Sequence, residues 1–577
     1  MSFLRSVCFN GRGKDTRMSG SIGTSSSASY DYVIIGAGSA GCVLANRLTE
    51  DGKSTVAILE AGGSDRSVLI QMPTALSIPM GMPKYNWSYH TEPEPFLDGR
   101  RMDLPRGKVL GGSSSINGMV YIRGNALDYE EWERLGAKGW GYRHVLPYFR
   151  RAESRAEGGD TYRGNDGPLH TSYGPLENPL YSVFIEAAKQ AGYPATDDVN
   201  GYQQEGFGRM DRTIHKGRRW SAANAYLKPA MRRPNLNVIT GAQATKLLFD
   251  RNRATAVVYR QGGEDKTINA TREIILAGGP INSPHLLKLS GIGPSDELRA
   301  HGIPVLAHRA GIGENLQDHL EFYFQHACTK PITLYSSMNL LSKALIGMRW
   351  ILRKDGLGAT NHFESCGFIR SRAGVPYPDI QYHFLPAAIA YDGSVKAEAH
   401  GFQAHVGPMR SKSRGWVRMA SANPLEPPKV RFNYLSHEDD WTEMRACVRL
   451  TREIFSQTAF APYRGQELQP GRDCITDEQI DAFIKQKVES AYHPSGTCRM
   501  GDENDPASVV NPEGRVIGVE RLRVADTSIM PQITTGNLNA PAIMIGEKIS
   551  DSIRGLAPPP PSNAPYFTAS AWKEKQR

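Results

Sequence analysis

Two short apolar runs, separated by a glycine-rich turn and a helical pattern, stand near the start of the chain between residues 31 and 62. The first run, residues 33–35, has the composition of a strand buried in a parallel sheet. The segment CVLANRL after the turn has the apolar spacing of a helix packed on that sheet, and a second run, residues 56–59, ends in Glu60. The pattern predicts a strand–helix–strand unit of an α/β domain.

The glycines of this turn have the spacing GxGxxG, and Glu60 follows the last of them by about 20 residues. In such a unit the first glycine permits a tight turn, the second admits a pyrophosphate and the third lets helix and strand pack closely. The helix N-terminus offers N–H groups to phosphates, and the acid accepts hydrogen bonds from a ribose. An ordinary unit without a ligand is the alternative. We predict a dinucleotide site formed by Gly36, Ala37, Gly38, Ser39, Gly41, Glu60 and Ala61.

The later hydrophobic patterns predict two interleaved lobes. Strand patterns dominate residues 235–279, and another strand and a helix are expected over 522–531 and 540–553. Alternating strands and helices over 320–490 favour an antiparallel sheet with helices. The fold class is therefore α/β and α+β, a Rossmann-like domain interleaved with a substrate domain. The expected boundaries are a disordered leader (1–29), the nucleotide-binding domain (30–170, 229–319 and 491–553), the substrate domain (171–228 and 320–490) and a proline-rich disordered tail (554–577).

The composition argues against a nucleic-acid-binding protein, a zinc protein and a membrane-spanning protein. The formal charge of +9 arises from 68 Lys+Arg against 59 Asp+Glu, yet no basic run or nucleic-acid module is present. The seven cysteines are scattered without CxxC spacing, which indicates a reducing compartment and no zinc site. No apolar stretch is long enough to span a membrane. The leader lacks the apolar core of a secretory signal, so it is either an organelle transit peptide or a disordered segment. We expect a disordered segment.

A second glycine-rich turn, GKVLGGSSSIN, contains Gly111, Ser113 and Asn117. Glycines with small hydroxyl residues bring backbone close to a ligand and supply N–H and O–H donors. A plain turn before a strand explains the same letters equally well. This turn is a candidate extension of the dinucleotide site.

Several longer segments carry a resemblance to a known family. They are GAGSAG, GKVLGGSSSIN, GPINSPHLLKLSGIG, GIGENLQDHL, YHPSGTCRMG and TTGNLNAPAIMIGEK. Together they resemble the glucose-methanol-choline (GMC) oxidoreductases, which use FAD, across residues 31–553. Within the family, YNWSYHTEPEP, RGNALDYEEW, NGYQQEGFGRMDRT, GATNHFES and PDIQYHFLP resemble the bacterial choline dehydrogenases.

The resemblance implies where FAD binds. It places Asp526 near the ribityl chain, Ala244 near the adenine, and Gly111, Ser113 and Asn117 along the isoalloxazine. Some relatives attach FAD through a histidine just before the asparagine of the second turn. Ile116 stands at that place here, so we expect non-covalent FAD.

The resemblance also implies the reacting groups. His493 matches the histidine that removes the hydroxyl proton, and Asn537 matches the second polar position, whose amide holds the developing alkoxide. Without the family, the interpretation of these two as residues of ordinary turns is favoured, since the chain has fifteen histidines. The expected substrate residues are Glu364, paired with a trimethylammonium group, His383 in the pocket and Trp87 in an aromatic wall.

The implied activity is oxidation of choline to betaine aldehyde, with hydride transfer to flavin N5 and a chemically reasonable second oxidation to the osmoprotectant glycine betaine. The electron acceptor is a membrane quinone chain or oxygen. We expect a cytoplasmic protein, with peripheral contact at the inner face of the cell membrane allowed by its basic charge. The alternatives are a dehydrogenase of another primary alcohol, a lyase that keeps FAD structurally, and a non-catalytic binding protein.

Overall fold

The computed structural model describes residues 28–389 and 399–577. All but the last two residues of the predicted leader therefore lie outside the described part. Over the described residues, no helix is long and apolar enough to cross a membrane.

The first lobe is built on a sheet of seven strands in the order β11-β2-β1-β14-β13-β12, with β25 paired to β14. The apolar runs predicted to be strands form its buried centre, since every residue of β2 and the last four of β1 are buried. β1 pairs in parallel with β2 on one side and with β14 on the other. The strands are β1 (Ser29–Ile35), β2 (Val56–Glu60), β11 (Leu236–Thr240), β12 (Gln243–Asp250), β13 (Arg253–Gln261), β14 (Glu264–Leu276) and β25 (Leu522–Val524).

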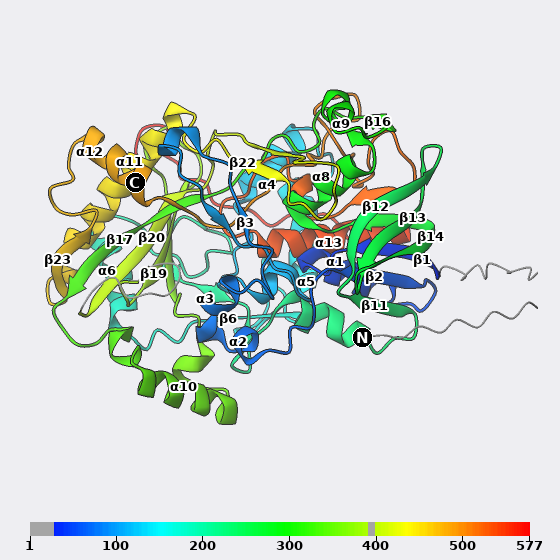
Figure 1. Ribbon diagram of the computed structural model, residues 1–577. Helices are drawn as coiled ribbons and strands as arrows, with labels where there is room; N and C mark the ends of the chain where they lie inside the picture. Colours follow the sequence, from blue (N-terminus) through cyan, green and yellow to red (C-terminus); the bar gives the residue numbers. More distant parts are fainter. Residues whose placement is uncertain (1–27, 390–398) are drawn as a thin grey trace, which may run out of the picture.

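Segments far apart in the chain meet in this lobe. β25 pairs in parallel with the end of β14, so the C-terminal segment enters the N-terminal sheet. The helices α1 (Ser39–Leu48) and α13 (Asn539–Arg554) pack together beside the sheet (Figure 1). Gly546 of α13 allows this approach, because a Cβ there would lie 2.9 Å from the Cβ of Val43. The lobe also contains α4 (Ala126–Arg134), α5 (Tyr142–Ala152) and α8 (Gly279–Leu289).

The second lobe is built on an antiparallel sheet in the order β23-β17-β20-β19-β18-β7, with β24 paired to β17. α6 (Pro179–Gln190) and α11 (Glu438–Ser456) pack on it through aromatic side chains, and Phe184 stacks on Phe384 with ring centres 4.7 Å apart. The strands are β7 (Gly206–Arg209), β17 (Leu320–Cys328), β18 (Ser365–Ile369), β19 (Ile380–Leu385), β20 (Gly401–Pro408), β23 (Arg464–Gln469) and β24 (Glu489–Ser490).

The chain alternates between the two sheets. β7 lies in the second sheet, β11 to β14 in the first, β17 to β20 in the second and β25 in the first (Figure 1). The predicted fold class, an α/β domain interleaved with an antiparallel substrate domain, is confirmed. α10 (Leu340–Arg353) and α12 (Asp477–Lys487) complete the longer helices of the substrate lobe.

The C-terminal tail corrects one expectation. Its prolines predicted disorder, but the segment after α13 runs as extended chain from the first lobe to the second (Figure 1). The N–H of Ser562 donates to the carbonyl of Arg143 on α5, and the carbonyl of Trp572 accepts from Gly374 in the second lobe. Prolines lack the backbone N–H, so contacts with the rest of the protein are what hold the proline-rich stretch in place. Composition alone could not reveal them.

Candidate active site

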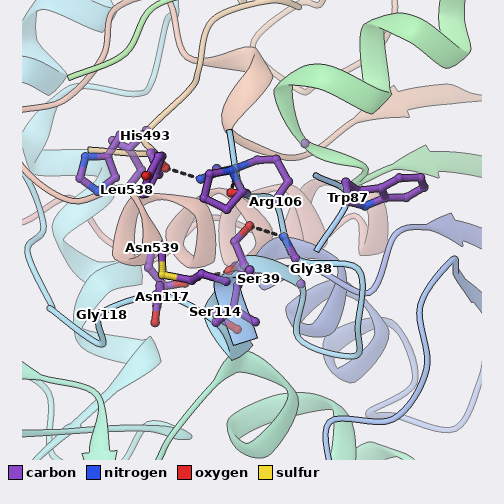
Figure 2. Close-up of a pocket in the computed structure, with 18 of the residues that line it drawn as sticks. Gly38, Ser39, Trp87, Arg106, Ser114, Asn117, Gly118, His493, Leu538 and Asn539 are labelled. Atoms are coloured by element: carbon purple, nitrogen blue, oxygen red, sulfur yellow. Dashed lines mark hydrogen bonds between the residues drawn. The ribbon is translucent and has the colours of Figure 1, made fainter. Parts of the chain in front are cut away.

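A cavity of about 670 Å³ lies between the two lobes. Its walls come from the ends of the parallel strands on one side and from the antiparallel sheet on the other, and Figure 2 shows part of this lining. Of the predicted site residues, those that line it are Gly36, Gly38, Ser39, Glu60, Ala61, Trp87, Ser113, Asn117, Ala244, His383, His493, Asp526 and Asn537. Ala37, Gly41, Gly111 and Glu364 are not among its lining residues.

The three glycines of the first turn have different reasons to be glycine. Gly36 has φ +99°, and a Cβ there would lie 2.5 Å from the carbonyl oxygen of Ala277. A Cβ on Gly41 would lie 2.0 Å from the carbonyl oxygen of Gly36, so this glycine permits helix and strand to pack. Gly38 is extended, and a Cβ there would meet no atom closer than 3.7 Å. Contacts within the chain therefore do not require glycine at position 38, which lines the cavity.

The N-terminus of α1 opens into this space. Gly38 is the N-cap residue and no side chain caps the helix, so its first N–H groups are available to an anion. Glu60, at the end of β2, lines the same region. Its two oxygens accept hydrogen bonds from the N–H groups of Gly62 (2.8 Å) and Ala37 (2.9 Å), which fixes the carboxylate. Burial raises the pKa of Glu60 to about 7.

The second turn is held against the first. A Cβ on Gly112 would lie 2.7 Å from the Cα of Gly38, so the two turns are in backbone contact. The hydroxyl of Ser114 donates to the carbonyl of Gly111 at 2.6 Å, which holds the short helix η3 (Gly112–Ser115). The hydroxyl of Ser113 accepts from the N–H of Gly107 at 3.1 Å. Gly111 therefore shapes the turn without lining the cavity.

Asp526 follows β25 and lies at the wall formed by the start of α8. One of its oxygens accepts from the N–H of Gly279 (2.9 Å) and the hydroxyl of Ser283 (2.6 Å), and the other from the N–H of Ser528 (2.8 Å). Burial raises its pKa. His285 of α8 also lines the cavity, and its Nε2 has no hydrogen-bond partner within the described chain. An unpaired buried nitrogen, an uncapped helix and two backbone turns in contact fit a bound dinucleotide.

His493 and His319 form a histidine pair at the other part of the cavity. His319 is buried, its Nε2 lies 2.9 Å from the carbonyl oxygen of Met409, and its Nδ1 lies 3.1 Å from Nδ1 of His493. A carbonyl only accepts, so Nε2 of His319 carries the proton and Nδ1 of the neutral ring is an acceptor. Nδ1 of His493 must then donate, which leaves Nε2 of His493 as the acceptor nitrogen of the ring. The pair sets the tautomer that a base requires.

Electrostatics keep His493 neutral. Burial, followed by the neighbouring His319, His383 and Arg106, lowers the pKa of His493 well below its ordinary value. Burial also lowers the pKa of His319 to about 4. Both rings are therefore neutral at pH 7, as the tautomer assignment requires.

Asn537 joins His493 to the antiparallel sheet. Its amide nitrogen donates to Nε2 of His493 at 3.1 Å, and its oxygen accepts from Nε2 of Gln381 at 3.1 Å. His383 Nε2 lies 3.3 Å from the same oxygen. Gln381 and His383 come from β19, so this cluster spans both lobes. A small alcohol placed here would meet a base and an amide donor together.

Glu364, predicted to pair with the substrate cation, is not among the residues that line the cavity. It lies behind the cavity wall, where one carboxylate oxygen accepts from the N–H of Leu176 (2.7 Å) and the other from the hydroxyl of Thr360 (2.7 Å). Its Cβ and Cγ would both lie 2.5 Å from a Cβ on Gly174, so the side chain is packed against a loop. These contacts hold the carboxylate inside the protein, behind the cavity wall.

A carboxylate that lines the cavity on the side of the antiparallel sheet is Glu321, the second residue of β17. Glu321 is buried, and one of its oxygens lies 3.1 Å from Nδ1 of His405. Burial lowers the pKa of His383, and the negative charge of Glu321 partly offsets this by raising it. Reasoning from sequence missed Glu321. The signal was present, because Glu321 follows the family segment GIGENLQDHL directly.

The aromatic residues divide between two parts of the cavity. Trp87 stacks on Tyr89 at 5.8 Å, already has the Lys108 ammonium 4.7 Å from its ring centre, and lies apart from His493 in Figure 2. Phe363 also lines the cavity and contacts His405 edge to face, with ring centres 5.4 Å apart. Phe363, which was not predicted, is therefore a cavity aromatic beside His405, the hydrogen-bond partner of Glu321.

Comparison with protein-family models gives two matches, both described as GMC oxidoreductase, over residues 30–321 and 411–546. The chain is 59% identical to the oxygen-dependent choline dehydrogenase of Brucella ovis over 547 residues, which are 95% of this chain and 100% of the relative. It is 57% identical to the protein of the same name from Photobacterium profundum, covering 95% of this chain and 97% of the relative.

Two solved structures share the fold at appreciable identity. Pyridoxine 4-oxidase from Mesorbium loti superposes with a TM-score of 0.82 at 31% identity, covering 91% of this chain and 99% of the other. An FAD-dependent oxidoreductase from Chaetomium thermophilum superposes with a TM-score of 0.83 at 28% identity, covering 92% and 100%.

Proposed function

Since the chain belongs to the GMC oxidoreductase family, we propose that it is an FAD-dependent enzyme that oxidises choline to betaine aldehyde. The observation that carries the proposal is the unprotonated Nε2 of His493, paired with the amide of Asn537 in a cavity that also contains the carboxylate of Glu321. The relatives named choline dehydrogenase cover nearly the whole chain and support the choice of substrate.

The residues of the first lobe would hold FAD. The turn of Gly36 and Gly38 and the N-terminus of α1 would receive the pyrophosphate, and Glu60 the ribose hydroxyls. Asp526 and the second turn would contact the remainder. The side chain of Ile116 cannot form a covalent bond to the flavin, so the proposed binding of FAD is non-covalent. When bound, FAD supplies the two-electron acceptor for the hydride.

Substrate recognition follows from the charge of choline. A quaternary ammonium has no N–H to donate, so only charge and aromatic faces can hold it. Glu321 provides the charge and Phe363 an aromatic face. Glu321, and not Glu364, is therefore the proposed cation-binding residue.

The chemical step begins with the substrate hydroxyl. His493 Nε2 accepts the hydroxyl proton, and the amide of Asn537 donates to the oxygen as it becomes an alkoxide. The electrons of the alkoxide then expel a hydride from the α-carbon. His383, on the opposite sheet, lines the same space and helps to position the oxygen. The hydrate of the aldehyde product retains an oxidisable C–H bond, so the same residues can act again to form glycine betaine.

Two acceptors can remove the electrons. The names of the relatives specify oxygen, which would become hydrogen peroxide. A membrane quinone, reduced to the quinol, is the second candidate, because the exposed apolar helix α10 contributes two residues, Lys343 and Ile346, to the cavity lining. Peripheral contact with the inner face of the cell membrane belongs to this second candidate.

Anaerobic titration of the holoenzyme with choline tests the proposal. Choline should bleach the flavin absorbance, whereas ethanol and glucose should leave it unchanged. Bleaching by ethanol but not by choline would favour a dehydrogenase of another primary alcohol. A yellow protein that no alcohol bleaches would favour a lyase, and a protein that purifies without flavin would favour a binding protein. Oxygen uptake against reduction of a soluble quinone then separates the two acceptors.

A further inference from the structure

α10 presents its apolar side to solvent. Leu341, Leu345, Met348 and Leu352 recur every three or four positions, so they lie on one face of the helix, and they are between 51% and 76% exposed. Leu340 (84%) and Ile351 (55%) border the same face. A surface helix of a globular protein normally turns such a stripe towards the core. Here the stripe is uncovered, and a contiguous row of exposed apolar side chains marks an interaction surface.

The opposite side of α10 attaches it to the protein. Trp350 is its one buried residue, and the indole N–H of Trp350 donates to the carbonyl of Gly217 at 2.6 Å. The short helix that follows, η6 (Gly356–Ala359), packs Gly358 against the Trp350 ring. In Figure 1 the helix projects from the edge of the substrate lobe. The exposed face is therefore held outward by a fixed contact.

Basic side chains border the apolar face. The charged residues of α10 are Lys343, Arg349 and Arg353, all exposed, and the helix itself contains no acidic residue. Arg349 and Arg353 border the apolar face, and Arg349 also pairs with Asp355, just after the helix, at 2.7 Å. Lys343 lies on the opposite side of the helix, which faces the cavity. The contact of Trp350 with Gly217 brings two more exposed bases, Lys216 and Arg218, to the same edge of the lobe. A helix with a leucine-rich face and a basic border has the composition of one that lies in the interface of an anionic membrane.

We propose that α10 docks the protein on the surface of an anionic lipid bilayer, with Leu341, Leu345 and Leu352 inserted among the acyl chains and the basic residues paired with lipid phosphates. The charge of the surface selects this partner, because a second copy of the same helix would bring like charges together. The net charge of +9 adds a general attraction to the bilayer. Lys343 and Ile346 of α10 line the cavity, so docking brings the cavity to the bilayer surface.

Vesicle co-sedimentation of the holoenzyme tests this proposal. We expect binding to vesicles of equimolar phosphatidylcholine and phosphatidylglycerol, and much weaker binding to phosphatidylcholine alone or at high salt. Replacing Leu341, Leu345 and Leu352 together by Gln should weaken binding to the anionic vesicles by at least about tenfold. Replacing Arg349 and Arg353 by Gln should weaken it several-fold and reduce its salt dependence.

The matched control replaces three exposed apolar residues elsewhere, Leu425, Leu468 and Ile475, by Gln. This control should bind as the unchanged protein does, and all variants should retain its melting temperature. Equal binding by the α10 leucine variant, or no binding of the unchanged protein to anionic vesicles, would overturn the proposal. So would a fall in particle mass caused by the leucine variant in the absence of vesicles, because the face would then join two copies of the chain.

Discussion

Nδ1 of His319 lies 3.1 Å from Nδ1 of His493, although the two residues are 174 positions apart in the chain. The carbonyl of Met409 fixes the proton of His319 on its other nitrogen, so His319 accepts from His493. The base of the proposed reaction thus owes its tautomer to a buried neighbour. This relationship leads to the first predictions.

Replacing His319 by Leu should slow anaerobic flavin reduction by choline about tenfold or more, since His493 would lose the acceptor that holds its tautomer and ring orientation. Replacement by Gln should restore much of the rate, because its amide can both accept from His493 and donate to Met409. Stopped-flow absorbance measures the rate. A His319→Gln variant as slow as His319→Leu would show that packing, not the hydrogen bond, is what matters.

Removing the base itself should have a larger effect. His493→Ala should reduce the rate of flavin reduction by about a hundredfold or more, while flavin content stays unchanged. Asn537→Ala should give a smaller loss, since it removes one donor to the developing alkoxide. His144→Ala, on α5 outside the cavity, is the control and should keep the full rate. An active His493→Ala variant would refute the assignment of the base.

Arg106 gives a prediction with a defined sign. Its positive charge helps to lower the pKa of His493, and a protonated His493 cannot accept the hydroxyl proton. Arg106→Met should therefore raise this pKa and move the acidic limb of the pH–rate profile to higher pH. Arg101→Met removes a more exposed charge and should leave the profile in place. A shift to lower pH after Arg106→Met would contradict the assigned electrostatics.

Glu321 and Glu364 can be separated by experiment. Glu321→Gln should raise the KM for choline about tenfold to a hundredfold, because the cation would lose its buried counter-charge. It should change the KM for 3,3-dimethylbutan-1-ol little, since that alcohol has the shape of choline without the charge. Glu364→Gln should leave both values within about twofold and lower the free energy of unfolding by about 1–3 kcal/mol. The reverse pattern would restore the cation-binding role to Glu364.

The glycines of the first turn also differ in their expected effects. Gly38→Ala should fold normally and bind FAD about ten- to a hundredfold more weakly, since residue 38 lines the cavity where the pyrophosphate is proposed to bind. Gly36→Ala should fail to fold, because of its positive φ and the contact with Ala277. Gly63→Ala, where no atom lies within 4 Å, is the control. Flavin content and melting temperature distinguish these outcomes. Normal flavin affinity in Gly38→Ala would argue against the proposed pyrophosphate site.

Local features were predictable because they depend on neighbours in sequence. The strand, turn and helix around Gly36, Gly38 and Gly41 follow from side-chain periodicity and backbone conformation, and Glu60 follows from its place at the end of the second strand. His493 and Asn537 were found through motifs of a family. Nothing in their own surroundings along the chain separates them from ordinary turn residues.

The amino-acid sequence by itself determined the fold class, the first glycine turn and the family, since each depends on residues that lie close together along the chain. Only the tertiary structure decided that Glu321 lines the cavity while Glu364 is held behind it, that His319 sets the tautomer of His493, and that the proline-rich tail is ordered. The reason is physical. The direction in which a carboxylate points, the partner of an imidazole and the order of an extended segment all depend on groups that lie close in space and far apart in the chain.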